Sequence, residues 1–144
     1  MLAKAAALAT LAACGQEVTI DMVAHAMPAI SHHLERSFGH PVVVARDGFP
    51  VYVGVAETPD GCLGHWDGYG DHAVINISPR IGTYNTVPSL LLHELGHAMG
   101  LKHEPSGIMR AEAETLDPYV AAEQLAELCR HHACTQPLLV KVAR

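Results

Sequence analysis

One short run of residues constrains this chain more than any other feature. Residues 93–103 read His-Glu-Leu-Gly-His-Ala-Met-Gly-Leu-Lys-His, which is HExxHxxGxxH without a mismatch. The run lies on a predicted helix that opens at Pro88, carries an apolar stripe and ends near Gly100. With 11 histidines and 12 glycines in 144 residues, chance gives such a match in about 3 of 10,000 chains. The spacing therefore calls for a chemical explanation.

The spacing places the polar groups around one point. A helix completes a turn in about 3.6 residues, so His93 and His97 project from nearly the same face and can reach one ion. Glu94 is rotated by about 100 degrees from His93, so its carboxylate can accept a proton beside the metal without binding it. His103 can return to the ion only if the chain turns, which Gly100 permits because glycine readily adopts the left-handed conformation.

Three neutral imidazoles with a fourth position open to water are typical of a catalytic zinc site. Zinc lowers the pKa of bound water towards about 7. A neighbouring carboxylate that takes a proton from this water leaves a hydroxide-like nucleophile, which can attack an amide carbonyl. HExxHxxGxxH followed by Ser106-Gly107-Ile108-Met109 resembles the metzincin zinc metallopeptidases, and is most similar to the small bacterial matrixin-like members. The resemblance covers residues 63–109. It implies a zinc endopeptidase with one catalytic Zn²⁺, in which Met109 is the apolar floor beneath the metal, Glu94 is the general base and the ligands are His93, His97 and His103.

The same resemblance implies an α+β, zincin-like fold: a mixed, mostly parallel sheet with a long backing helix, an active-site helix and a C-terminal helix. Residues 62–66 would form the edge strand that pairs with an extended peptide, and residues 110–118 would wall a side pocket. The chain departs from the family at two places. The strand expected before the long helix is missing or reduced to residues 16–20, and Ala111 stands where some relatives have a catalytic tyrosine.

The remaining sequence supplies the other elements. Apolar residues at helical spacing predict helices over residues 19–38 and 118–131. Two valine-rich runs, 41–45 and 51–55, predict two strands around a turn at residues 46–50. Asp47-Gly48 favours a local hairpin there, whereas the resemblance implies parallel pairing, and the sequence leaves both open. Residues 62–66 and 72–78 predict a second hairpin joined by residues 67–71. The length fits one domain.

The first 14 residues resemble a signal segment with a lipobox, which leaves residues 15–144 as the catalytic domain. A lipidated Cys14 would attach the chain to a membrane, so we expect an exported envelope lipoprotein or a secreted protein. Cys62, Cys129 and Cys134 then allow one disulfide and one free thiol. The sequence does not choose the pair, although Cys129 and Cys134 lie close together at a predicted helix end and are preferred.

The net charge and the remaining histidines bear on which partners and further metal ions the chain could bind. A net charge of −6 without a basic cluster argues against nucleic acid. The resemblance implies a peptide or protein substrate, and we expect a monomeric chain. His65, Asp67 and His72 are candidates for a second, structural metal, with solvated loop residues as the default interpretation. Two alternative functions remain open: a catalytically silent, zinc-stabilised binding module of the envelope, and a zinc amidase acting on cell-wall peptides.

Overall fold

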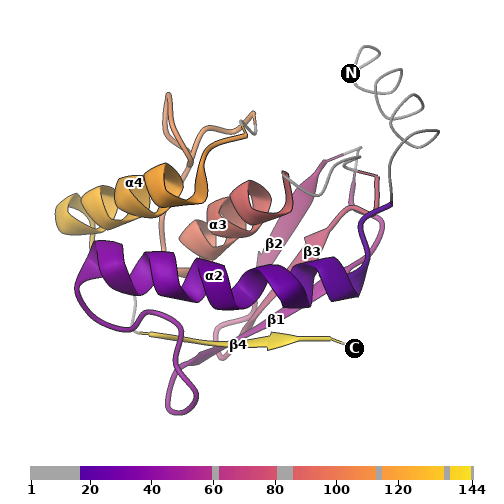
Figure 1. Cartoon of the computed structure of the whole chain (residues 1–144), viewed down its shortest axis with the longest axis horizontal. Coiled ribbons are helices and arrows are strands. Elements are labelled where there is room, and N and C mark those ends of the chain that lie inside the picture. Colours follow the sequence, from indigo (N-terminus) through magenta and orange to yellow (C-terminus); the bar gives the residue numbers. More distant parts are fainter. Residues whose placement is uncertain (1–16, 60–61, 81–85, 113–114, 135–136, 144) are drawn as a thin grey trace.

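The computed structural model describes residues 17–59, 62–80, 86–112, 115–134 and 137–143. The signal and lipobox prediction, including Cys14, lies outside these residues. Figure 1 shows the described elements, which in chain order are α2 (Ile20–Phe38), β1 (Phe49–Val55), β2 (Gly64–Gly68), β3 (Ala73–Ile77), α3 (Thr86–Ala98), α4 (Pro118–His131) and β4 (Leu138–Val142).

The four strands form one sheet in the order β2-β3-β1-β4. β1 runs parallel to both β3 and β4, whereas β2 runs antiparallel to β3 and occupies an edge. The expected α+β architecture is therefore confirmed at this level, with a mixed, mostly parallel sheet and three described helices. The hairpin predicted around residues 67–71 is confirmed as β2 and β3, and the prediction of an edge strand is confirmed for β2, although its bounds shift to Gly64–Gly68.

The helices share one face of the sheet. Along β3 every second residue is completely buried, and in β1 buried valines flank Tyr52, which is 42% exposed. Such alternation means that one face of the sheet packs on the core and the other faces solvent. α2 crosses in front of the sheet, with α3 and α4 beside it (Figure 1). Its buried side is made of Val23, Ala26, Met27, Ile30 and Leu34.

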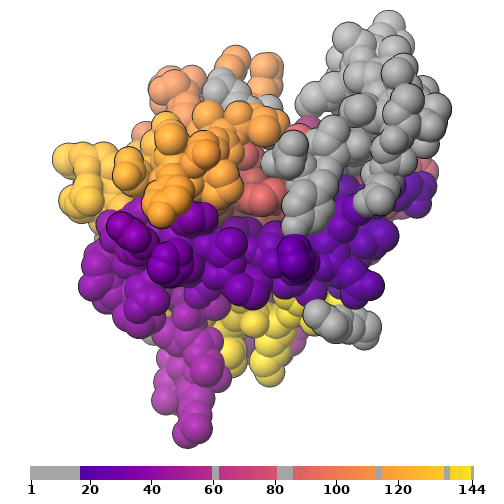
Figure 2. Space-filling model, viewed as in Figure 1, coloured from indigo at the N-terminus to yellow at the C-terminus, as the bar shows by residue number. Residues whose placement is uncertain are grey.

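The local hairpin that Asp47-Gly48 favours between residues 41–45 and 51–55 is wrong. Leu138 of β4 pairs in parallel with Val43 on one side and with Phe49 on the other, so the C-terminal strand lies between the two valine-rich runs. Gly48 makes this possible, because a Cβ there would lie 2.7 Å from the Leu139 nitrogen. The turn itself, residues 44–48, projects below the body of the molecule (Figure 2).

A strand at the C-terminal end of the chain was not foreseen from the sequence. Residues 138–142 hold only five residues of mixed burial, and nothing in so short an apolar run distinguishes a strand from a loop. Residues 17–19, the described part of the segment that precedes α2, form no strand. The fourth strand of the sheet is thus β4, near the C-terminal end of the chain, and not a strand before α2.

A disulfide links Cys129, near the C-terminal end of α4, to Cys134, five residues later and beyond the helix. The preferred pairing is therefore confirmed. Cys62 is a free, exposed cysteine just before β2. Among the described residues, no helix has the length and the hydrophobicity needed to cross a membrane.

Candidate metal centre

Helix α3 supplies two of the three histidines. Within Thr86–Ala98 almost every residue is buried, because the helix packs between the sheet and the other helices. His93 is 7% exposed and His97 is half-buried one turn further along. Their ring centroids are 4.9 Å apart, as expected for side chains on one helical face.

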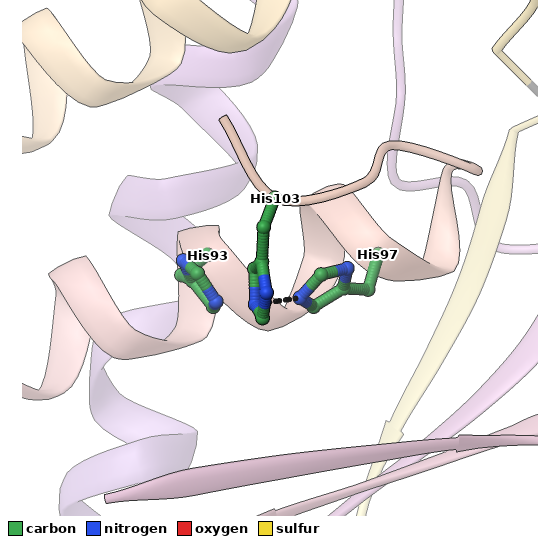
Figure 3. Close-up of side chains that lie close together, drawn as sticks. All are labelled: His93, His97 and His103. Carbon is green, nitrogen blue, oxygen red and sulfur yellow. Dashed lines mark hydrogen bonds between the residues drawn. The ribbon is translucent and has the colours of Figure 1, made fainter. Parts of the chain in front are cut away.

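The third histidine is brought back by the way the helix ends. Gly100 has a φ of 102°, its N–H donates to the His97 carbonyl, and the next N–H, of Leu101, donates to the Gly96 carbonyl. This pair of bonds around a left-handed residue is a Schellman motif, which ends a helix and redirects the chain. Figure 3 shows the consequence: the ring of His103 hangs from the following loop between the rings of His93 and His97.

Hydrogen bonds orient the two helical imidazoles. Nδ1 of His93 lies 2.6 Å from the Ile108 carbonyl oxygen, and Nδ1 of His97 lies 2.8 Å from the Leu101 carbonyl oxygen. A carbonyl can only accept, so each Nδ1 carries the proton and each neutral ring presents the lone pair of Nε2. Burial also lowers the pKa of both His93 and His97, which favours the neutral form that binds metals.

The three donor atoms fit a single cation. Nε2 of His97 lies 3.1 Å from Nε2 of His103, and all three candidate ligand atoms lie within 4.8 Å of one another. Two nitrogens bound tetrahedrally at the usual zinc distance would lie about 3.3 Å apart. Because the His93 donor nitrogen converges on the same place, the three rings could hold one ion.

Glu94 belongs to α3, and its side chain points to the edge strand β2. Its side chain is buried, at 4% exposure, and burial raises the pKa of its carboxyl group to about 7. Its Oε2 would lie 3.3 Å from a Cβ at Gly64, the first residue of β2. The absence of a side chain at Gly64 therefore leaves room for the carboxylate beside the strand that carries the exposed edge.

Met109 packs beneath this helix. Its side chain is completely buried, and its sulfur is so close to Gly96 that a side chain at Gly96 would overlap it. Leu125 of α4 approaches the same glycine, 2.9 Å from the position of a Cβ. An apolar, tightly packed layer thus supports the turn of α3 that separates His93 from His97.

Trp66 lies on the side of β2 that faces the helices. Its ring centroid is 6.0 Å from that of His97, and its indole covers Gly68, where a Cβ would meet the ring at 2.8 Å. The buried Nε1 has no hydrogen-bond partner among the described residues. Tyr69, the residue after β2, lies apart from the histidine cluster: it is 58% exposed and stacks on His72.

The candidate second metal site is not assembled. Among the described residues, the only group of three or more potential ligands within reach of one ion is His93, His97 and His103. His65 contacts Asp67 at 3.1 Å, and His72 contacts Asp71 at 2.7 Å, so these side chains form separate pairs. They are partly exposed to solvent, as the default interpretation expects, but His65 and Asp67 lie on β2 and not in a loop.

Three supporting residues were missed in the sequence: Gly64, Ser89 and Gln124. Ser89 is 3% exposed on α3, and its hydroxyl donates to the Leu116 carbonyl and accepts from the Leu116 N–H. This pair of bonds anchors the end of the segment expected to wall the side pocket. No spacing rule singles out such residues, because their partners lie far away in the sequence.

A cavity of about 440 Å³ opens elsewhere, between the C-terminal ends of α2 and α4. Its lining includes Phe38, Met99 and the disulfide, and none of the three clustered histidines. The positive side chain of Arg130 there lies in the last turn of α4, where the helix dipole favours it. The cavity therefore adds nothing to the chemistry of the histidine cluster.

The chain was compared with models of protein families, with curated proteins and with solved structures, and none of the three comparisons found a match. The likeness to metzincins thus depends on the motif and on the geometry described above.

Proposed function

We propose that this chain is a zinc-dependent endopeptidase of the metzincin type, with a zincin-like fold. One observation carries the proposal: the donor nitrogens of His93, His97 and His103 lie within 4.8 Å of one another, and the helix that bears two of them also bears the buried carboxyl group of Glu94. Neutral imidazoles in this number suit zinc, and an acidic group on the same helix suits hydrolysis. The open edge of β2 supplies a place where an extended peptide can pair.

Each residue has a distinct part in the proposed reaction. His93, His97 and His103 would hold the ion, which supplies Lewis acidity for the substrate carbonyl and for water. Glu94 would take a proton from the attacking water and pass it to the leaving amine. Its raised pKa, about 7, suits a group that both accepts and donates protons near neutral pH.

The edge strand would orient the substrate. In the described sheet β2 pairs only with β3, so the backbone groups along its other side are free to pair with a further strand. Pairing there would carry a peptide past Gly64 and the carboxyl group of Glu94. Trp66 on the same strand would contact the substrate next to His97.

The test is Glu94→Gln, with Glu123→Gln on an exposed position of α4 as the matched control. The Glu94 variant should bind one zinc per chain and cleave a quenched peptide library at least about 100-fold more slowly than wild type. The control should cleave at the wild-type rate. Undiminished cleavage by the Glu94 variant would refute the mechanism. Zinc-loaded wild type that cleaves no peptide would instead favour a binding module.

We also propose that the chain is exported. The Cys129–Cys134 disulfide supports this, because disulfides persist in oxidising compartments and are rare in the cytosol. The measurement is mass spectrometry of the mature N-terminus in cell fractions. A diacylglyceryl group on Cys14 in the membrane fraction is the expected result, and an unprocessed N-terminus on cytosolic protein would contradict it.

A further inference from the structure

Helix α4 reaches the metal centre through one polar side chain. Oε1 of Gln124 accepts a hydrogen bond of 2.7 Å from the N–H of Ile108. The carbonyl of the same residue accepts the 2.6 Å hydrogen bond from Nδ1 of His93. Ile108 is 4% exposed; its hydrogen bond with His93 is buried, and its hydrogen bond with Gln124 is partly buried. An unbroken chain of contacts thus runs from α4 to the ring of His93.

The approach of Gln124 depends on a glycine. Gly107 has a φ of 79°, and a Cβ at this position would lie 2.6 Å from Oε1 of Gln124. Any other residue at position 107 would therefore push the amide away from Ile108, in addition to straining the backbone. The turn is tied further by bonds from Arg110 N–H to the Gly107 carbonyl and from Glu104 N–H to the Met109 carbonyl.

Packing of α4 does not itself require this amide. Ala121, Ala122 and Leu125 are completely buried and Ala126 nearly so, and Leu125 contacts the helix of the histidines at Gly96. These side chains account for the position of α4 against α3. The bond from Gln124 to Ile108 is therefore a separate feature, directed at the loop whose carbonyl orients a metal ligand.

We propose that Gln124 is a positioning residue of the metal centre. It holds Ile108 so that the Ile108 carbonyl fixes the proton and the ring plane of His93, and so that Met109 stays packed on Gly96. This inference rests on the proposed function, since it presumes that His93 binds zinc. Groups that hydrogen-bond directly to a ligand change metal affinity by about 10- to 100-fold. Gln124 acts one bond further away, so we expect an effect of about 10-fold.

The test uses three substitutions at one position. Gln124→Met keeps the length of the side chain and removes the acceptor, Gln124→Asn keeps the amide and shortens its reach, and Gln124→Glu keeps an acceptor at the same distance. Glu123→Gln, on the exposed side of the helix, is the control. The measurements are the zinc dissociation constant by competition with a chromophoric chelator, the visible spectrum of the Co²⁺ form, and thermal unfolding of metal-free protein.

The Met and Asn variants should bind zinc about 10-fold more weakly and show an altered Co²⁺ spectrum, whereas the Glu variant and the control should stay within about 3-fold of wild type. A purely structural role predicts a lower unfolding midpoint with unchanged zinc affinity, and that result would overturn the proposal. Wild type that binds no zinc would overturn the proposed function as well. Wild type that binds zinc tightly, with Met and Asn variants that match it, would overturn the role of Gln124 alone.

Discussion

Among the proposed ligands, His103 most cleanly separates metal binding from folding. The side chain is exposed, and its described contacts are with the rings of His93 and His97, at centroid distances of 5.4 and 4.8 Å. Substitution of such a surface residue usually changes the free energy of unfolding by about 0.5 kcal/mol or less. Without metal, His103→Ala should therefore unfold within about 2 °C of wild type.

Zinc should change this comparison. At a free concentration 100 times its dissociation constant, a ligand stabilises the folded state by about 2.7 kcal/mol. A chain of 144 residues unfolds with an entropy of about 0.3 kcal/mol/K, so the wild-type midpoint should rise by about 9 °C. If loss of one nitrogen weakens binding about 100-fold, the same zinc concentration stabilises His103→Ala by about 0.4 kcal/mol, or about 1 °C.

The assay is thermal unfolding of chelator-treated protein in buffers of fixed free zinc. Lys102→Ala, an exposed neighbour in the same loop, is the control and should show the full rise. His93→Ala should behave differently, because it leaves the Ile108 carbonyl without its donor and lowers the metal-free stability by about 1–3 kcal/mol. A full zinc-induced rise in His103→Ala would refute the three-histidine site.

Three further outcomes test the fold and the surroundings of the site. Gly48→Ala should lower the free energy of unfolding, measured in urea, by about 1–3 kcal/mol, because its Cβ would lie 2.7 Å from the backbone of β4. Gly54→Ala is the control and should cost less, because its Cβ would meet only a side-chain oxygen, at 3.3 Å. Equal losses in the two variants would contradict the insertion of β4. Replacing Cys129 and Cys134 by alanine should cost about 2 kcal/mol, from the entropy of a loop closed over five residues, and a change below about 0.5 kcal/mol would contradict that account. Trp66 is the only tryptophan of the chain and its ring lies 6.0 Å from a proposed ligand, so Co²⁺ should quench the fluorescence reversibly with EDTA; unchanged emission would place the ion elsewhere.

The clustered histidines could be predicted because their geometry is local. His93 and His97 share a helix, Gly100 reverses the chain, and His103 follows at once, so helical geometry and the conformational freedom of one glycine fix their meeting. The helix bounds followed from apolar periodicity in the same way, to within two residues of the expected limits. A short range of sequence carried all the information that these features need.

The strand pairing around residues 41–55 could not be predicted, because a distant segment decides it. Asp47 and Gly48 favour a tight turn, and Asp47 does adopt a positive φ of 58°. The valine-rich runs nevertheless pair with Leu138, which joins the sheet from the other end of the chain. Gln124 was missed for the same reason, since its partner Ile108 is 16 residues away, in the loop between α3 and α4.

The same division between local ligands and distant supports gives a last prediction. A synthetic peptide of residues 86–110 contains the three histidines, Glu94 and Met109, and lacks α4 and the sheet. Isolated helices as short as α3, 13 residues, are marginal in water, so zinc would have to order the peptide as it binds. We expect the peptide to bind zinc at least about 100-fold more weakly than the whole chain, measured by the same chelator competition. If the peptide matched the whole chain, the ligands would need no support, and the hydrogen bond from Gln124 to Ile108 would have no part in metal binding.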